Sequence, residues 1–327
     1  MQTAVCTLFE GNYHFGVGAL VNSLCRTGFQ GTVFAGYRGE LPEWLAALGP
    51  SRNAEGHTLA RVTDTVSLVF IPMAGTWHLT NLKAALMLRV LRELSPKTER
   101  IFCFDPDMVC LAPWSFFEGW VDEGVALVID GNFPMPQNHP VRKAWRRYCE
   151  PHGLKFAGTA EDYYFNGGFL GIARKDIGFL EAWQKIHELI EPEEILSLPM
   201  GLAGAPDFKR RRSYPFWLRD QDALNIAADL EGMNLSPMGW EAMGWRQPFE
   251  FMLHACGSPK PWATNILREA IRGKSPEALM NFTFLDHFSG PIPVMSAEEI
   301  RRRIWQVRIA GAIAPFCGAL QWLKRSQ

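Results

Sequence analysis

The stretch Ile101-Phe102-Cys103-Phe104-Asp105-Pro106-Asp107 leads from an apolar run straight into two carboxylates. The apolar run is typical of a buried β-strand. Pro106 fixes its own φ and pushes Asp105 towards extended geometry, and side chains two positions apart in an extended segment project to the same side. The sequence therefore predicts that Asp105 and Asp107 converge at the carboxyl end of a strand, where a divalent cation and a diphosphate could meet. A capped turn is the competing interpretation of so short a motif.

Similar apolar runs alternate with helical patterns, which favours an α/β fold with a central sheet covered by helices. In the segment 80–94, for example, apolar residues recur every four positions from Leu82 to Leu94. The expected strands are residues 4–8, 32–35, 66–71, 101–104, 125–129 and 169–173, and the expected helices are 12–26, 80–94 and 177–190. Ligands of such sheets bind at the carboxyl ends of the strands.

Composition argues against several classes of function. The chain of 327 residues has 33 basic and 34 acidic residues and a formal net charge of −1, so it is not expected to bind nucleic acid. Its seven cysteines include no C-x-x-C pair, which argues against a zinc knuckle and fits a reducing cytosol. The N-terminal residues enter a strand without a basic and apolar leader, and the longest uncharged apolar run, 309–320, is too short to span a bilayer. These observations predict a cytoplasmic protein.

We expect a catalytic domain over residues 1–265 and a helical C-terminal extension over 266–327. Residues 191–217 interrupt the strand–helix rhythm with prolines, glycines and a run of four basic residues. They predict either an insertion that acts as an acceptor loop or lid, or a solvated excursion. The tail over residues 300–324 mixes arginines with isoleucines and tryptophans. It predicts either peripheral contact with an anionic membrane surface or a helix packed on the core.

A second string, residues 251–262, predicts a strand followed by a turn rich in glycine and proline. His254 in this string is a candidate third ligand for the cation. Gly257 permits close approach of the backbone to a phosphate, and Lys260 could offset the charge of a departing diphosphate. A packed histidine and an exposed lysine are the alternative interpretation.

Two further strings carry polar groups suited to a sugar. In Phe165-Asn166-Gly167-Gly168 the small residues open space and the amide can bond hydroxyls, although a tight turn explains the string as well. In Asp220-Gln221-Asp222-Ala223-Leu224-Asn225 polar residues lead into a helix, where acidic side chains also suit the helix dipole. Three tryptophans are candidates either for stacking on a sugar ring or for the core: Trp217, Trp240 and Trp245.

Taken in order, these strings resemble the glycosyltransferases of family 8, which are retaining, metal-dependent enzymes with a GT-A fold. The resemblance covers roughly residues 3 to 262 and rests on Glu10-Gly11-Asn12-Tyr13, Asp105-Pro106-Asp107, Phe165-Asn166-Gly167-Gly168, Asp220-Gln221-Asp222-x-Leu224-Asn225 and His254-x-x-Gly257-x-x-Lys260-Pro261-Trp262. It implies a mixed, mostly parallel central sheet flanked by helices and followed by a helical extension. The family's usual acidic pair before Asn12 is Glu10-Gly11 here. The span between the third and fourth strings is long, so acceptor recognition is expected to differ.

The resemblance also implies a role for each matching residue. Asp105, Asp107 and His254 match the positions that hold Mn²⁺; two carboxylates with an imidazole suit manganese better than magnesium or calcium, and Mg²⁺ is the alternative ion. The other matches are to the nucleotide (Glu10, Asn12 and Tyr13), the donor (Lys83), its sugar (Asp130, Asn166, Gly167 and Gly168), its diphosphate (Gly257 and Lys260) and the anomeric carbon (Gln221 and Asp220).

The implied reaction transfers a hexose from a UDP-sugar to a glycan or lipid-linked acceptor with retention of configuration. Because the Gln221 amide is a poor nucleophile, front-face attack by the acceptor is favoured, with Gln221 and Asp220 stabilising positive charge. Asp220 is the candidate nucleophile of a double displacement. Two other functions stay open: a haloacid dehalogenase-like, metal-dependent phosphohydrolase, which also places D-x-D after an apolar strand, and a non-catalytic nucleotide-sugar-binding protein.

Overall fold

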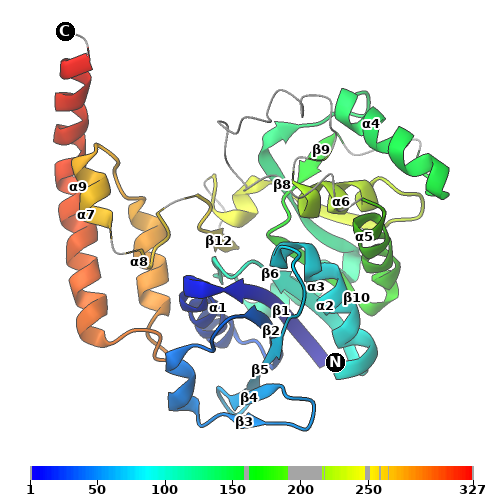
Figure 1. Cartoon of the computed structure of the whole chain (residues 1–327), viewed down its shortest axis with the longest axis horizontal. Helices are drawn as coiled ribbons and strands as arrows, with labels where there is room; N and C mark the ends of the chain where they lie inside the picture. The colour runs from blue at the N-terminus through cyan, green and yellow to red at the C-terminus, as the bar shows by residue number, and fades with distance from the viewer. Residues whose placement is uncertain are drawn as a thin grey trace. The chain divides into compact units, whose positions relative to one another are not determined.

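The computed structural model describes residues 2–157, 162–190, 216, 218–246, 251–257, 259–263 and 265–325. They belong to two compact units, whose elements are drawn in Figure 1. Unit 1 comprises Met1–Cys6, Gly75–Phe104 and Ser115–Arg246, and unit 2 comprises Thr7–Ala74, Asp105–Trp114 and Gln247–Gln327. The insertion expected over residues 191–217, with Trp217, lies outside the described residues apart from Phe216.

Unit 1 is built on a mixed sheet in the strand order β11-β8-β10-β6-β1. Strand β6 pairs in parallel with β1 and antiparallel with β10, while β8 pairs antiparallel with β10 and β9 and in parallel with β11. The strands are β1 (Gln2–Glu10, of which residues 7–10 belong to unit 2), β6 (Thr98–Phe104), β8 (Val125–Pro134), β9 (Tyr163–Phe165), β10 (Phe169–Ala173) and β11 (Leu235–Met238).

Helices of unit 1 pack on this sheet and on one another. α2 and α6 both pack against α5, and Figure 1 shows α5 and α6 side by side. The helices are α2 (Lys83–Arg89), α3 (Trp114–Glu123), α4 (Pro140–Cys149), α5 (Ile177–Leu189) and α6 (Arg219–Ala228). Short helical turns are η3 (Leu79–Leu82), η4 (Val90–Leu94), η5 (Glu150–His152), η6 (Arg174–Asp176) and η9 (Trp240–Met243).

Unit 2 contains a second group of strands and a separate ribbon. β2 (Gly31–Arg38) and β5 (Val66–Pro72) pair in parallel, and β4 (Thr58–Arg61) and β3 (Ser51–Arg52) extend them antiparallel. The ribbon consists of β7 (Met108–Cys110) and β12 (Met252–His254). The helical elements are η1 (Gly11–Tyr13), α1 (His14–Thr27), η2 (Glu43–Leu48), α7 (Ile266–Ile271), α8 (Ala278–His287) and α9 (Ala297–Arg325).

The elements confirm the predicted α/β class. Each of the six expected strands lies within β1, β2, β5, β6, β8 or β10, and the three expected helices correspond to α1, the η3–α2–η4 segment and α5. The end of β6 is buried from Ile101 to Phe104, as the apolar run predicts. Phe104 packs on Phe169 with ring centroids 5.0 Å apart, which fixes the strand end from which the D-x-D turn starts. The short strands β3, β4, β7, β9 and β11 were not expected.

The C-terminal tail is helical, as predicted. Ser296 Oγ accepts a hydrogen bond from Glu299 N at 3.1 Å at the start of α9. α9 packs on α7 and α8 (Figure 1), and a stripe of residues on it is buried: Arg303, Val307, Ala310 and Ala314. Among the described residues, no helix has both the length and the apolar character that crossing a membrane requires. The domain boundary expected near residue 265 stays a prediction.

Candidate functional site: a carboxylate–histidine centre and a buried polar cluster

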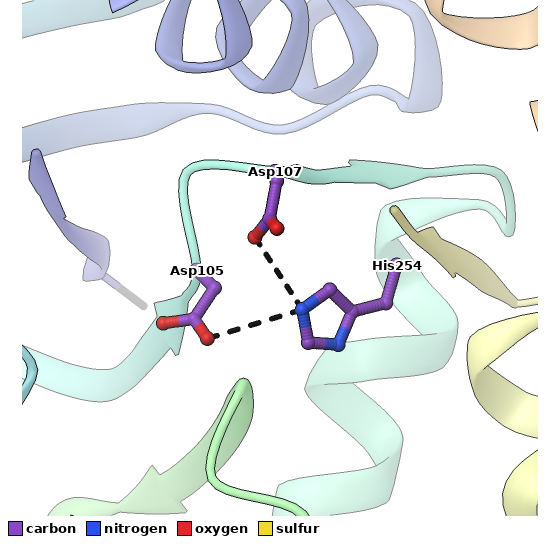
Figure 2. A group of neighbouring side chains, drawn as sticks. All are labelled: Asp105, Asp107 and His254. Carbon is purple, nitrogen blue, oxygen red and sulfur yellow. Dashed lines mark ion pairs between the residues drawn. The ribbon is translucent and has the colours of Figure 1, made fainter. Parts of the chain in front are cut away.

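A ribbon in unit 2 explains how residues far apart in the sequence come together. β7 starts directly after Asp107, and β12 pairs with it antiparallel so that His254 lies opposite Met108. The pairing continues beyond the strand, because Ala255 N donates to Asp107 O at 2.9 Å. This register brings the imidazole beside the D-x-D turn, and Figure 2 shows both carboxylates directed at the same ring nitrogen.

Asp105, Asp107 and His254 form a candidate metal centre. Each offers one ligand atom, and these atoms lie within 4.8 Å of one another. His254 Nε2 is 3.3 Å from Asp107 Oδ1 and 3.9 Å from Asp105 Oδ2. Ligands that surround an octahedral ion at about 2.1 Å lie about 3 Å apart when adjacent and about 4 Å apart when opposite. The three donors are therefore a candidate site for a single divalent cation.

Lys260 belongs to the same cluster. Its ammonium donates to an oxygen of Asp107 and, at 2.6 Å, to Ala255 O. Burial opposes ionisation of Asp107, but attraction to His254 and Lys260 outweighs it and holds the pKa of this carboxyl well below its ordinary value. Burial likewise disfavours a charged His254, yet Asp107 raises the pKa of the imidazole to about 10. The carboxylate and its two cationic neighbours thus stabilise one another in the charged form.

The residues expected at the nucleotide lie together in unit 2, where β1 ends. Glu10 is the last residue of β1, and Asn12 and Tyr13 lie in η1, which leads into α1. The Tyr13 ring packs edge-on against Trp262 with centroids 5.5 Å apart, and Lys260 Nζ lies 5.6 Å from the Tyr13 centroid. The first and last strings of the sequence resemblance are therefore in contact.

Two glycines shape the backbone around this centre. A Cβ on Gly16 would lie 2.0 Å from Pro106 O and 2.8 Å from the Trp262 ring, so only glycine lets α1 pack this closely on the D-x-D turn. Gly257 adopts a φ of 81°. This left-handed conformation strains other residues and accounts for glycine in the turn after β12.

Unit 1 holds a second cluster, made of side chains that the resemblance assigns to the donor sugar (Asp130 and Asn166) and to its anomeric carbon (Gln221). Asp130 Oδ2 accepts hydrogen bonds from Asn166 Nδ2 at 3.0 Å and from Gln221 Nε2 at 3.1 Å. Gln221 Oε1 accepts from Gly167 N at 2.8 Å, and Asn166 Oδ1 accepts from Gly168 N at 2.8 Å. All three side chains are buried, and both polar groups of the Gln221 amide are engaged.

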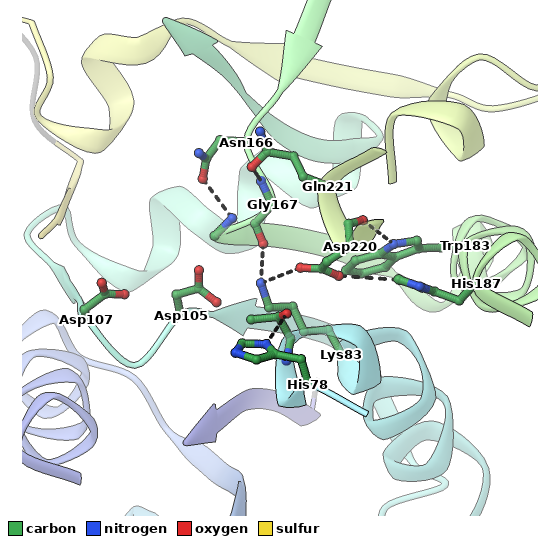
Figure 3. A network of polar contacts seen from close by, with 12 residues as sticks. His78, Lys83, Asp105, Asp107, Asn166, Gly167, Trp183, His187, Asp220 and Gln221 are labelled. Carbon is green, nitrogen blue, oxygen red and sulfur yellow. Dashed lines mark hydrogen bonds and ion pairs between the residues drawn. The ribbon is translucent and has the colours of Figure 1, made fainter. Parts of the chain in front are cut away.

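Lys83 ties this cluster to Asp220, as Figure 3 shows. Its Nζ donates to Gly167 O at 2.7 Å and to Asp220 Oδ2 at 2.9 Å. The peptide groups of Gly167 are thus held on the N–H side by Gln221 and on the carbonyl side by Lys83. The lysine side chain is only 4% exposed, and its ammonium forms a largely buried ion pair with Asp220.

Residues to which the sequence analysis assigned no individual role hold this cluster in place. Asn225, fully enclosed in α6, accepts from Phe165 N at 2.7 Å and donates to Phe165 O and Gln221 O, both at 2.8 Å. Tyr164 donates its hydroxyl to Asp222 at 2.7 Å. We call these three hydrogen bonds of the Asn225 side chain the clamp. The spacing of four between Gln221 and Asn225 places both residues on one face of a helix, and this spacing is the signal by which the sequence could have indicated the contact.

The tryptophans named as candidates for sugar stacking have different settings. Trp240 is 37% exposed and packs on Gly131, where an added Cβ would lie 1.9 Å from the indole. The Arg246 guanidinium lies 5.7 Å from the centre of the same ring. Trp245 is half-buried, and Trp217 is outside the described residues. Stacking on a sugar stays a prediction for Trp240 and Trp245.

Comparison with known proteins bears on the fold. No family model matches the sequence, and a search of curated proteins finds no match. The chain is similar to the WbbM bifunctional glycosyltransferase in its apo structure, with a TM-score of 0.52 and 14% identity over 92% of this chain and 51% of that one. It is also similar to the glycosyltransferase GlyE of Streptococcus pneumoniae TIGR4, with a TM-score of 0.52 and 14% identity over 95% of this chain and 64% of that one. The chain thus spans about half of the first protein and less than two thirds of the second. The likeness shows that this mixed α/β chain has the GT-A fold of glycosyltransferases.

Proposed function

We propose that the chain is a metal-dependent, retaining glycosyltransferase of the family 8 type, which moves a hexose from a UDP-sugar to a glycan or lipid-linked acceptor. The observation that carries this proposal is the convergence of Asp105, Asp107 and His254 within 4.8 Å, with Lys260 on the same carboxylate. The sequence resemblance and the GT-A fold support it.

In this proposal, side chains of unit 2 bind the nucleotide diphosphate. Asp105, Asp107 and His254 would hold Mn²⁺, with Mg²⁺ as the alternative; when bound, the ion supplies Lewis-acid stabilisation of the charge on the leaving group. Lys260 adds a positive charge for the same diphosphate. The backbone at Gly257 lies close to the phosphates. The uridine is bound by Glu10, Asn12 and Tyr13.

Side chains of unit 1 bind the hexose in this proposal. Asp130, Asn166 and Gln221 present carboxylate and amide groups that can exchange their mutual hydrogen bonds for bonds to sugar hydroxyls. Gly167 and Gly168 leave room for the ring, and Lys83 holds Gly167 O. These groups are preorganised by the clamp from Asn225, which reduces the cost of fixing them around a ligand.

Front-face attack suits the charges of this cluster. The Asp220 carboxylate is paired with Lys83 at 2.9 Å, which weakens it as a nucleophile. The acceptor hydroxyl would instead form its bond to the anomeric carbon as the bond from that carbon to the diphosphate oxygen breaks. The hydroxyl proton passes to the departing diphosphate. Asp220 and the carbonyl of Gln221 stabilise the positive charge that develops on the sugar.

The alternative functions have less support. A haloacid dehalogenase-like phosphohydrolase would leave the histidine–lysine string and the Asn166 cluster without a role, and the similar solved structures are glycosyltransferases. A phosphatase screen with Mg²⁺ tests it directly. A non-catalytic nucleotide-sugar binder would have no use for the full set of Asp105, Asp107, His254 and Lys260. Hydrolysis of a UDP-sugar without acceptor would exclude this reading.

A thermal-shift panel of UDP-sugars with and without Mn²⁺ tests the proposal. Ligand at 100 times its Kd adds about 2.7 kcal/mol to the free energy of unfolding. We expect a UDP-sugar with Mn²⁺ to raise the Tm, and Asp107→Ala to remove most of this shift. Asp64→Ala is the matched control, because Asp64 lies in the same unit, is exposed and forms its ion pair with the exposed Arg61. Equal shifts in both variants would reject the metal assignment.

Retention has its own test. Slow hydrolysis of an α-linked UDP-hexose, followed by NMR before mutarotation, should release the α-anomer first. Release of the β-anomer first would contradict a retaining mechanism while leaving the metal assignment standing.

We propose further that residues 1–265 are the catalytic domain and that α9 contacts an anionic membrane surface. Exposed positions of α9 include Arg301 and Arg302, Trp305 one turn further along (61% exposed) and Phe316 about three turns beyond that (74% exposed). Co-sedimentation with anionic but not with neutral vesicles is the expected result, and Trp305→Ser should weaken it. The cytoplasmic location expected from the sequence stays a prediction.

A further inference from the structure

In unit 1, Asp220 of the proposed site faces a buried histidine to which the proposed function gives no role. His187, on α5, is 2% exposed, and its Nε2 lies 3.5 Å from Asp220 Oδ1. Within the described part of the chain, neither ring nitrogen of His187 nor Asp220 Oδ1 has a hydrogen-bond partner. Buried polar atoms without partners are costly. Each of these two facing atoms is therefore the natural partner of the other.

Asp220 connects this histidine to the sugar cluster. Its other oxygen holds Lys83, whose ammonium donates to Gly167 O. The backbone oxygen of Asp220 accepts from Trp183 Nε1 at 3.1 Å, so α5 contacts Asp220 on two sides, as Figure 3 shows. A rotation of the carboxylate that follows loss of its histidine neighbour would release Lys83 and with it the Gly167 carbonyl.

We propose that His187 is a positioning residue that donates its Nε2–H to Asp220 and so fixes the carboxylate in the orientation that holds Lys83. The role rests on the proposed function, because it matters for catalysis only if Asp220 and Gly167 act on a donor sugar. His187 touches no substrate in this proposal and acts through Asp220. The prediction about its tautomer does not depend on any activity.

A pocket beside the histidine makes a rescue experiment with free imidazole feasible. It has a volume of about 220 Å³ and is lined by His187 together with Trp77, Asn81 and Gln184. Truncation of the side chain would join its space to this pocket. Free imidazole from solution could then reach the position that the ring occupies in the wild type.

The tautomer is measured first, on the wild-type protein. Long-range ¹H–¹⁵N NMR on histidine-labelled protein, with the His187 signal assigned from its absence in His187→Gln, should show a proton on Nε2 and a resonance that shifts in Asp220→Asn. A neutral ring with its proton on Nδ1, or a signal unaffected by Asp220→Asn, overturns the proposal.

Kinetics separate positioning from packing. Hydrolysis of the UDP-hexose that stabilises the wild type with Mn²⁺ is the assay. Since loss of an outer hydrogen-bond partner costs roughly ten- to a hundredfold, His187→Leu should lower kcat by that factor with little change in the KM for the donor. His187→Gln should retain more activity because its amide can donate, and imidazole should partly restore His187→Ala. Equal losses in the leucine and glutamine variants with no effect of imidazole overturn the proposal. If the wild type hydrolyses no UDP-sugar, the proposed function fails, and the tautomer alone decides the role of His187.

Discussion

Replacing Lys260 with methionine should tighten the binding of Mn²⁺. In the structure the side chain of Lys260 is 17% exposed, and its ammonium contacts one oxygen of Asp107, the carboxylate whose other oxygen lies 3.3 Å from His254 Nε2. Burial alone would lower the pKa of Lys260, but Asp107 raises it above its ordinary value. The side chain therefore stays charged at neutral pH and competes with any cation for Asp107.

The size of the effect follows from the geometry. An ion bound to the other oxygen of Asp107, the one beside His254, would lie about 4 Å from the ammonium. Two unit charges at this separation repel by about 1 kcal/mol in water, and a divalent ion doubles the figure to about 2 kcal/mol. That energy corresponds to about thirtyfold in Kd. Because the site is partly shielded from water, this is a lower bound as long as the lysine keeps its position.

Isothermal titration of Mn²⁺ without nucleotide measures the change. Lys260→Met should bind Mn²⁺ about thirtyfold more tightly than the wild type, yet bind UDP more weakly in the presence of Mn²⁺, because the diphosphate loses its cationic partner. Lys274→Met is the matched control, since Lys274 is 65% exposed, lies in the same unit and pairs with Glu269. Unchanged or weaker Mn²⁺ binding in Lys260→Met would refute the reasoning. Opposite signs for the two ligands cannot arise from general loss of structure.

Three substitutions probe the supporting structure. Gly16→Ala should weaken Mn²⁺ binding and lower the free energy of unfolding by at least about 2 kcal/mol, because its Cβ would overlap Pro106 O at 2.0 Å. The control is Gly119→Ala, at a helical site with no heavy atom within 4 Å, where the free energy of unfolding should rise by up to about 1 kcal/mol. Equal effects of the two substitutions would contradict the packing argument. Asn225→Ala leaves buried backbone groups without their partner and should cost about 3 kcal/mol in urea denaturation; a loss below about 1 kcal/mol would show that water replaces the clamp. Burial lowers the pKa of His287 from 6.5, so the folded protein resists its protonation while the unfolded chain does not. The free energy of unfolding should therefore fall as the pH drops through about 6.5, and this slope should flatten in His287→Gln.

The sequence predicts those strands and turns that depend only on the residues of one short string. The apolar run that ends at Phe104 predicts a buried strand, and the glycines of the later strings predict turns, because these features depend on neighbouring residues alone. The string at His254 also predicts a strand and a turn, which the structure bears out. The short strands β3, β4, β7, β9 and β11 were missed, since two to four residues are too few to show a period.

Contacts between residues of different strings could not be predicted from the sequence in the same way. Spacing indicates that Asp107 and His254 are suitable ligands, but only the antiparallel register of β7 and β12 makes them neighbours. Likewise, the resemblance implies that Lys83 contacts the donor, but nothing in the pattern around it indicates that it is buried against Asp220 and Gly167. His187 was named only as part of a helix. Contacts of this kind depend on packing between distant segments, which periodicity does not encode.

The charges of the metal centre show why the pairings matter for function. Taken separately, the D-x-D string is an anionic site and the histidine–lysine string is a cationic one. In the fold they neutralise each other, because Lys260 and His254 both contact Asp107. A cation that binds to the carboxylates would repel the ammonium, and in the proposed reaction the diphosphate gives that ammonium a new partner. In the proposed reaction, metal and nucleotide would therefore favour each other's binding, and Lys260, which would oppose metal binding in the free protein, would become a ligand of the donor.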